Sequence, residues 1–297
     1  MAVRRRPPAD LTAGSTTRAG PAHLLPCWPV RSVEVEPGVS LAVHVDGDGP
    51  ATVVLVHGLA STAQLWAGVA ADLVASGVRA VRLDLRGHGE SDAPETGYDT
   101  ATAASDVATA VRAVGPGPVV LAGQSWGGNV VLRVAAEHPD LVRGLALVDG
   151  GWIRLAGRFP DWPSALTSLT PPDIDGWPVQ RFAQVVAASL AGFPAGAAQA
   201  AMSVVRVEAD GTIRRRLPVE RHLQILESMW RDDPRVSYPL VQAPTLLMPA
   251  TDGEVPPDVV EAAGLLPHAA VRPYVGAHHD LHLQRPAEVA ADLRSLL

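Results

Sequence analysis

Short, almost uninterrupted apolar runs alternate with longer segments of helical periodicity along most of this chain. Ala51–Val56 is such a run, and apolar residues on both faces are typical of strands inside a parallel sheet. Val78–Asp84 and Val142–Val148 are further expected strands. Between them, Thr100–Val114 repeats Ala and Val at helical spacing. This alternation predicts right-handed βαβ units, and therefore a mostly parallel sheet covered by helices on both faces. We expect further strands at Arg31–Glu36, Val39–Val45, Pro118–Ala122, Thr245–Pro249 and Ala270–Val275, and further helices at Ser61–Ser76, Gly127–Glu137 and Ala287–Leu297.

The alternation stops at Gly150-Gly151 and resumes near residue 240. Prolines repeatedly interrupt the helical stretches between these two points, which predicts an insertion folded apart from the sheet. We therefore expect a core formed by residues 31–149 and 240–297, and a helical cap formed by residues 150–239. Residues 1–30 are rich in Pro, Gly, Thr, Ala and Arg without periodicity, and we expect a flexible extension there.

Composition excludes several classes of function. The net charge of −7 and the pI of about 5.8 have the wrong sign for a general nucleic-acid binder. All 24 basic residues are arginine, so a Schiff-base lysine, a P-loop lysine and a Ser-Lys dyad are impossible. The single cysteine, Cys27, cannot form an internal disulfide. No apolar run is long enough to cross a bilayer, and Arg4-Arg5-Arg6 precedes no apolar segment of a signal peptide. We expect a cytoplasmic protein, monomeric or homodimeric, without membrane or nucleic-acid partners.

The most specific motif is Gly123-Gln124-Ser125-Trp126-Gly127-Gly128, which lies between an expected buried strand and an expected helix. This is the context that G-x-S-x-G requires. A nucleophilic serine on a sharp strand-to-helix turn needs small residues two positions before and after it. The N-terminus of the following helix then directs N–H groups toward a developing negative charge.

With this motif, residues 31–297 resemble the α/β-hydrolase superfamily, in particular its cap-bearing epoxide hydrolase and esterase-like branch. The resemblance also rests on His57-Gly58, on Asp84–Ser91 (DLRGHGES) and on a late histidine followed by Pro286. It implies an α/β-hydrolase fold with an eight-stranded sheet flanked by helices and a helical cap. Dehalogenases and epoxide hydrolases of this branch need Asp at position 125, so Ser125 favours a serine hydrolase.

The resemblance also implies which residues would complete a triad with Ser125, since this fold orders its triad as Ser, acid, His. Family spacing to Pro286 selects His279 as the base, with His278 as the alternative; His282 is expected to pack or to cap the last helix. A metal bound by His278 and His282 would lack a recognisable third ligand. Asp252 follows the expected strand Thr245–Pro249 and is our candidate acid.

Two alternatives to Asp252 stay open: Glu254 in the same loop, and Asp149, at the position that some relatives use. The oxyanion hole maps to the N–H groups of Leu59 and Trp126, and His57 is expected to hold that loop. Asp84 and Arg86 resemble a turn-stabilising pair of the family. The tryptophans expected to roof a hydrophobic substrate pocket are Trp152, Trp162, Trp177 and Trp230.

These residues predict a serine hydrolase that cleaves an ester or lactone of a hydrophobic small molecule through an acyl-enzyme on Ser125, without cofactor or metal. The same triad would serve a thioesterase, a C–C bond hydrolase, or an amidase or iminopeptidase. A non-catalytic ligand-binding protein with this fold is the alternative of another class.

Overall fold

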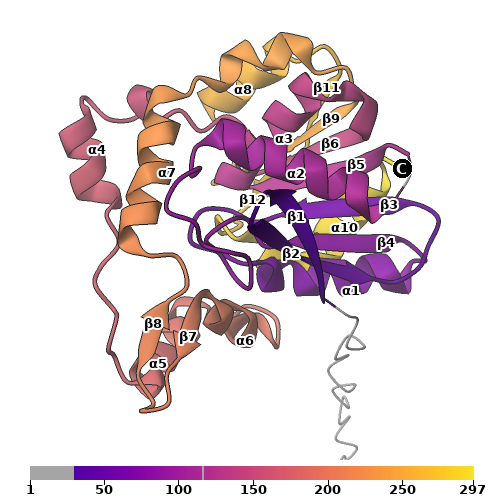
Figure 1. Ribbon diagram of the computed structural model, residues 1–297. Coiled ribbons are helices and arrows are strands. Elements are labelled where there is room, and N and C mark those ends of the chain that lie inside the picture. Colours follow the sequence, from indigo (N-terminus) through magenta and orange to yellow (C-terminus); the bar gives the residue numbers. More distant parts are fainter. Residues whose placement is uncertain (1–29, 116) are drawn as a thin grey trace, which may run out of the picture.

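The computed structural model describes residues 30–115 and 117–297, so the expected extension over residues 1–30 lies, apart from Val30, outside the described residues. Its centre is an eight-stranded sheet in the order β1-β2-β4-β3-β5-β6-β9-β11 (Figure 1). β2 is antiparallel to β1 and β4, and the other neighbours are parallel. The strands of this sheet are β1 (Val30–Glu36), β2 (Val39–Asp46), β3 (Thr52–Val56), β4 (Arg79–Leu83), β5 (Val119–Gln124), β6 (Val142–Val148), β9 (Thr245–Met248) and β11 (Ala269–Val271).

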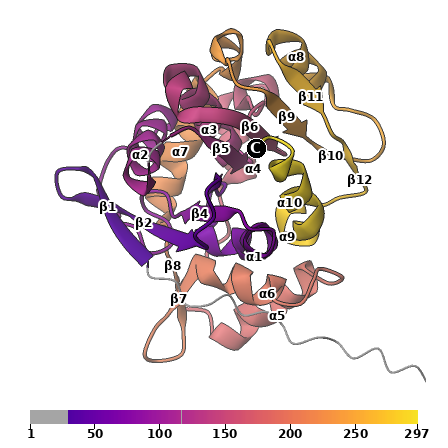
Figure 2. The ribbon, with the colours of Figure 1, turned by 90° about the vertical axis from the view of Figure 1, so that its right-hand side faces the viewer.

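Helices cover both faces of the sheet, as Figures 1 and 2 show. Strand alternation explains the continuous apolar runs: Val54 and Val56 join one buried cluster, whereas Val53 and Leu55 join the other. The first cluster packs α2 (Thr100–Val114), α3 (Trp126–Glu137) and α8 (Pro257–Leu265) on the sheet. The second packs α1 (Ala67–Ala75) and α10 (Pro286–Arg294) on the opposite face. α9 (Leu281–Gln284) precedes α10.

The segment between β6 and β9 forms two parts beside the sheet (Figure 1). One part, with α4 (Trp162–Leu169) and α7 (Val219–Arg231), packs on the first core cluster through residues of α7. The other has a small core of its own around Phe182 and Ile213. It contains α5 (Val179–Ser189), α6 (Ala197–Ala201) and the hairpin β7 (Val205–Val207) and β8 (Ile213–Arg215).

Two buried ion pairs hold the first strands and the loop after β4. Arg82 Nε donates to Asp46 at 2.6 Å, and Arg86 Nε donates to Asp106 at 2.7 Å. Asp84, which the family pattern places with Arg86, has other partners: its carboxylate accepts the N–H of Ala63 at 2.7 Å. Asp84 and Arg86 therefore stabilise the loop after β4 through separate partners, not through each other.

The expected strand Ala270–Val275 is wrong as one element, because the chain turns at Arg272-Pro273. Residues 269–271 continue the main sheet, whereas β12 (Tyr274–Val275) pairs with β10 (Ala250–Thr251) in a separate two-stranded sheet. Pro273 has no N–H to donate to a ladder, which explains the break. In the described part of the chain, no helix is long and apolar enough to cross a membrane.

Candidate active site

Ser125 lies on a strained turn between β5 and α3. Its backbone has φ 54° and ψ −125°, a region that residues other than glycine rarely adopt. The turn closes because its neighbours are glycines: a Cβ at Gly123 would lie 2.2 Å from the carbonyl oxygen of Gly127. A Cβ at Gly127 would lie 2.4 Å from that of His57. The geometry is that of a nucleophile elbow, with Ser125 at the N-terminus of a twelve-residue helix.

The loop after β6 packs directly on this elbow. Asp149 has a positive φ of 43°, and a Cβ at Gly150 would lie 2.1 Å from the carbonyl oxygen of Ser125. The buried side chain of Asn129 fixes the next residues: it donates to the carbonyl of Ile153 at 2.7 Å and accepts the N–H of Gly151 at 3.0 Å. The backbone of Asp149 is therefore tied to the same helix that follows Ser125.

His279 is hydrogen-bonded to Asp149. Its Nδ1 lies 2.6 Å from Asp149 Oδ2, while Asp149 Oδ1 accepts the N–H of Ala250 at 3.0 Å. Burial disfavours the imidazolium, but the hydrogen bond and charge of Asp149 together outweigh it and raise the pKa of His279. Because a carboxylate only accepts, Nδ1 of the neutral ring carries the proton and Nε2 keeps a lone pair.

Within the described part of the chain, no hydrogen bond joins Asp252 to His279, and Nδ1 of the ring is paired with Asp149 instead. Asp252 and the alternative Glu254 are exposed, beyond the point where Ala250 and Thr251 pair with β12. Asp149 occupies the position beside Nδ1. The open alternative at the end of β6 is the one that the geometry favours.

The two neighbouring histidines have other surroundings. His278 is exposed, and its ring packs edge-on against Phe193 of the inserted segment at 5.5 Å. His282 is 1% exposed, and its ring lies 4.4 Å from that of Trp66. No group of three or more His, Cys, Asp or Glu residues within 30–115 and 117–297 is placed to hold a metal ion.

Gln124 is a residue of the site that sequence reasoning missed. Its side chain is buried, and its Nε2 lies 3.2 Å from Nε2 of His279 and 3.2 Å from the carbonyl oxygen of His279. The available signal was a polar side chain at the end of the otherwise apolar strand Val119–Gln124.

Two buried histidines shape the loop that carries Leu59. His57 Nδ1 donates to the carbonyl of Gly58 at 2.7 Å, and its Nε2 accepts the N–H of Leu85 at 3.0 Å. His88 Nε2 accepts the N–H of Ala60 at 3.2 Å. Burial lowers the pKa of both rings, that of His88 to about 3, so both stay neutral.

Among the described residues, no backbone acceptor takes the N–H of Leu59 or of Trp126. Both groups are therefore free to donate to an oxyanion.

The four tryptophans expected to roof one pocket do not lie together. Trp152 is buried in the first core cluster, and Trp162 and Trp230 pack on it with their rings 5.9 Å apart. Trp177 lies instead in the separate small core of the inserted segment, where the guanidinium of Arg181 covers its ring at 3.6 Å. Trp177 is separate from the other three, because α5 and the β7–β8 hairpin bury their apolar side chains against each other.

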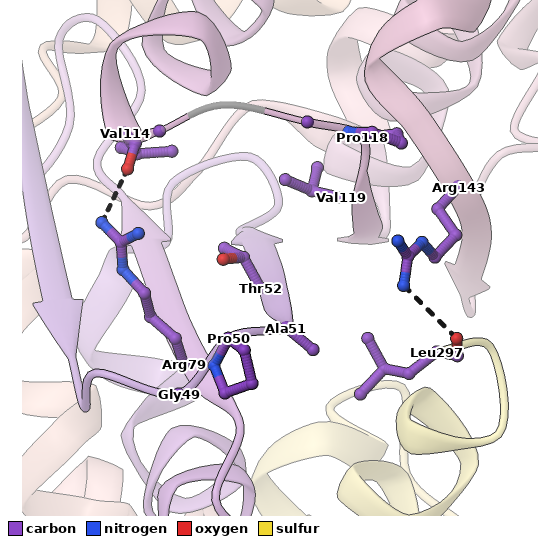
Figure 3. A pocket seen from close by; sticks show the side chains of 12 residues that line it. Gly49, Pro50, Ala51, Thr52, Arg79, Val114, Pro118, Val119, Arg143 and Leu297 are labelled. Carbon is purple, nitrogen blue, oxygen red and sulfur yellow. Dashed lines mark hydrogen bonds between the residues drawn. The ribbon is translucent and has the colours of Figure 1, made fainter.

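A hollow of about 600 Å³ lies at the amino-terminal ends of β3, β4 and β5 (Figure 3). Arg79 donates there to the carbonyl of Val114 at 2.7 Å, and Arg143 reaches the carbonyl of Leu297 at 3.5 Å. Ser125 follows the opposite, carboxyl end of β5, so this hollow is separate from the candidate site.

The buried ring of His282 predicts a loss of stability in acid. Burial lowers the pKa of His282 to about 4, so between pH 6.5 and about 4 the unfolded chain binds a proton that the native protein does not. This gap corresponds to roughly 3 kcal/mol. The wild type should therefore lose unfolding free energy between pH 7 and pH 4.5, as measured by urea unfolding. In His282→Leu this loss should be smaller by up to about 3 kcal/mol. His268→Leu, at an exposed histidine, is the control; equal falls in both variants would contradict the prediction.

Comparisons with known proteins identify the family. The model of the alpha/beta hydrolase fold family matches residues 51–286, and the chain therefore belongs to this family. It is similar to a 2-(acetamidomethylene)succinate hydrolase of Mesorhizobium japonicum, with 34% identity over 111 residues, which are 37% of this chain and 39% of that protein. It is also similar to an esterase of Mycobacterium tuberculosis, with 37% identity over 123 residues, covering 41% and 40% of the two chains.

These matches span only about two fifths of the relatives' length. The crystal structure of E-2-(acetamidomethylene)succinate hydrolase superimposes with a TM-score of 0.75 and 24% identity, covering 91% of this chain and 98% of that one. That likeness shows the α/β-hydrolase fold.

Proposed function

We propose that this protein is a serine hydrolase that cleaves an ester or lactone of a hydrophobic small molecule, with Ser125 as nucleophile, His279 as base and Asp149 as the acid that orients it. The observation that carries the proposal is that the loop after β6 packs on the Ser125 turn and that its Asp149 is hydrogen-bonded to His279. A strained Ser125 follows β5, Asp149 follows β6, and the ring of His279 lies 2.6 Å from Asp149.

The reaction would follow the chemistry of such a triad. Nε2 of His279 takes the proton of the Ser125 hydroxyl while Oγ bonds to the substrate carbonyl carbon. The N–H groups of Leu59 and Trp126 and the N-terminus of α3 stabilise the oxyanion. The imidazolium gives its proton to the leaving alcohol as the C–O bond breaks, and a water then releases the acid and restores Ser125. Asp149 keeps Nδ1 protonated and stabilises the imidazolium.

The inserted segment supports a hydrophobic substrate and the role of a cap. Phe193 packs on His278, next to the base, and Ser203 of this segment lies 2.5 Å from Thr62, three residues after Leu59. Aromatic side chains such as Phe193 are typical of the lining of small-molecule sites. An acyl or alcohol part of apolar character fits these surroundings.

A fluorophosphonate probe, which reacts with activated serines, tests this proposal. We expect stoichiometric labelling of the native protein, with the adduct on the peptide that carries Ser125, and turnover of p-nitrophenyl esters with an optimum chain length. Ser61→Ala is the matched control, because Ser61 lies in the Leu59 loop with a buried hydroxyl, and it should label normally. Failure of the folded protein to label would refute the serine hydrolase and favour a ligand-binding role.

A further inference from the structure

The side chain of Gln124 spans the distance between the Leu59 loop and the His279 loop. Gln124 ends β5 and is 3% exposed. A Cβ at Gly58 would lie 2.6 Å from its Oε1, so glycine at position 58 leaves room for this oxygen. At the other end of the amide, Nε2 lies 3.2 Å from both the ring Nε2 and the carbonyl oxygen of His279.

The backbone carbonyl settles which way this amide points. A carbonyl oxygen only accepts hydrogen bonds, so the NH₂ group of Gln124 must face His279. One of its hydrogens goes to the carbonyl, and the other is directed at Nε2 of the ring. This agrees with Asp149, which requires the proton on Nδ1 and a lone pair on Nε2. The ring is therefore held in one tautomer from both sides.

We propose that Gln124 is a positioning residue, which holds the His279 loop and ring in place and occupies the lone pair of Nε2 until Ser125 donates its proton there. This inference rests on the proposed function, because it concerns the same base. Nε2 is the atom that must accept the proton of Ser125, so the hydrogen bond from the amide N–H to Nε2 must break before that step. Once Nε2 is protonated, two N–H groups would face each other, and the amide therefore opposes the imidazolium.

Several charges around His279 act on the same equilibrium. Asp149 and Asp280 favour the imidazolium, Arg158 of the inserted segment disfavours it, and the buried ring of His282 is nearby. Against this background, removal of the amide donor is expected to raise the pKa of His279, because a donor to the neutral ring stabilises the neutral form. A carboxylate at position 124 would raise the pKa further, since it favours the charged ring.

Histidine side-chain ¹⁵N NMR measures this effect without any substrate, with the His279 signals assigned through His279→Asn. We expect the pKa of His279 to rise by about 0.5–1 in Gln124→Met and by about 1 or more in Gln124→Glu. Gln124→Met keeps the length of the side chain without burying a charge. Its ester kcat should fall at least about tenfold, because the loss of the contacts that position the ring and its loop outweighs the release of Nε2. The acid limb of kcat/KM should move to higher pH with the pKa.

Gln284→Glu is the matched control. Gln284 accepts the N–H of His278 at 2.8 Å through its Oε1, so the substitution adds the same charge beside the same loop without removing an acceptor. It should change the pKa of His279 by less than half the effect of Gln124→Glu. An unchanged pKa in both folded Gln124 variants would overturn the inference even if Ser125 reacts with the probe. Absence of labelling in the wild type would instead refute the proposed function.

Discussion

Asp149→Asn should lower kcat/KM for a p-nitrophenyl ester about 10⁴-fold, whereas Asp252→Asn should leave it within about twofold of the wild type. The carboxylate of Asp149 is 2.6 Å from Nδ1 of His279, and its other oxygen accepts the N–H of Ala250. An asparagine fits the same space, but its NH₂ group toward Nδ1 would favour the tautomer with the proton on Nε2. That ring cannot accept the proton of Ser125.

The pH profile separates this effect from a loss of fold. Asp149 raises the pKa of His279, so the acid limb of kcat/KM in the wild type should lie above 6.5, with activity lost as the pH falls through it. The residual activity of Asp149→Asn should have its acid limb at lower pH, because the charge that favoured the imidazolium is gone. Asp252→Asn, at an exposed carboxylate, should keep the wild-type profile. A large loss in Asp252→Asn alone would show that the acid of the reaction is Asp252.

Much of the fold could be predicted from the sequence because the pattern of burial is strong. Short apolar runs bounded by turn residues, such as Val142–Val148, are too short for a helix and are found as buried strands. Thr100–Val114 is found as the helix α2 with the expected bounds. The helix Pro257–Leu265 was not expected, since it follows Pro256 and begins at a proline, and a proline pair is also typical of loops. Proline is favoured in the first turn of a helix, but a helix of nine residues is stable only where tertiary contacts support it.

The site shows where local patterns stop being informative. Ser125 is predictable because the elbow depends on neighbours within two residues in the sequence. The partner of His279 depends instead on where two loops from different strands end. In the structure the loop after β6 brings its carboxylate to His279, and this is a contact between segments distant in the sequence. Gly150 was the available clue for Asp149, since only glycine lets this loop approach the carbonyl of Ser125.

Ser125→Gly is expected to remove ester turnover, by about 10⁶-fold in kcat, and at the same time to raise the free energy of unfolding above that of Ser125→Ala. Both variants lack the nucleophile, so turnover should be equally low in both. They differ in the backbone, because φ of 54° with ψ of −125° is strained for alanine and accessible to glycine. Relief of strain is about 1–3 kcal/mol, and the greater freedom of an unfolded glycine offsets about 0.4–1 kcal/mol of it.

Glycine should therefore be the more stable of the two by about 1 kcal/mol, measured by urea unfolding at pH 7. The control pair is Ser105→Gly and Ser105→Ala, on the solvent-exposed part of α2, where φ is helical and glycine should be the less stable variant by about 1 kcal/mol. Opposite signs at the two positions would show that the strain belongs to the elbow. If Ser125→Ala were instead more stable than Ser125→Gly, the backbone of the elbow would not be strained, and the prediction would be wrong.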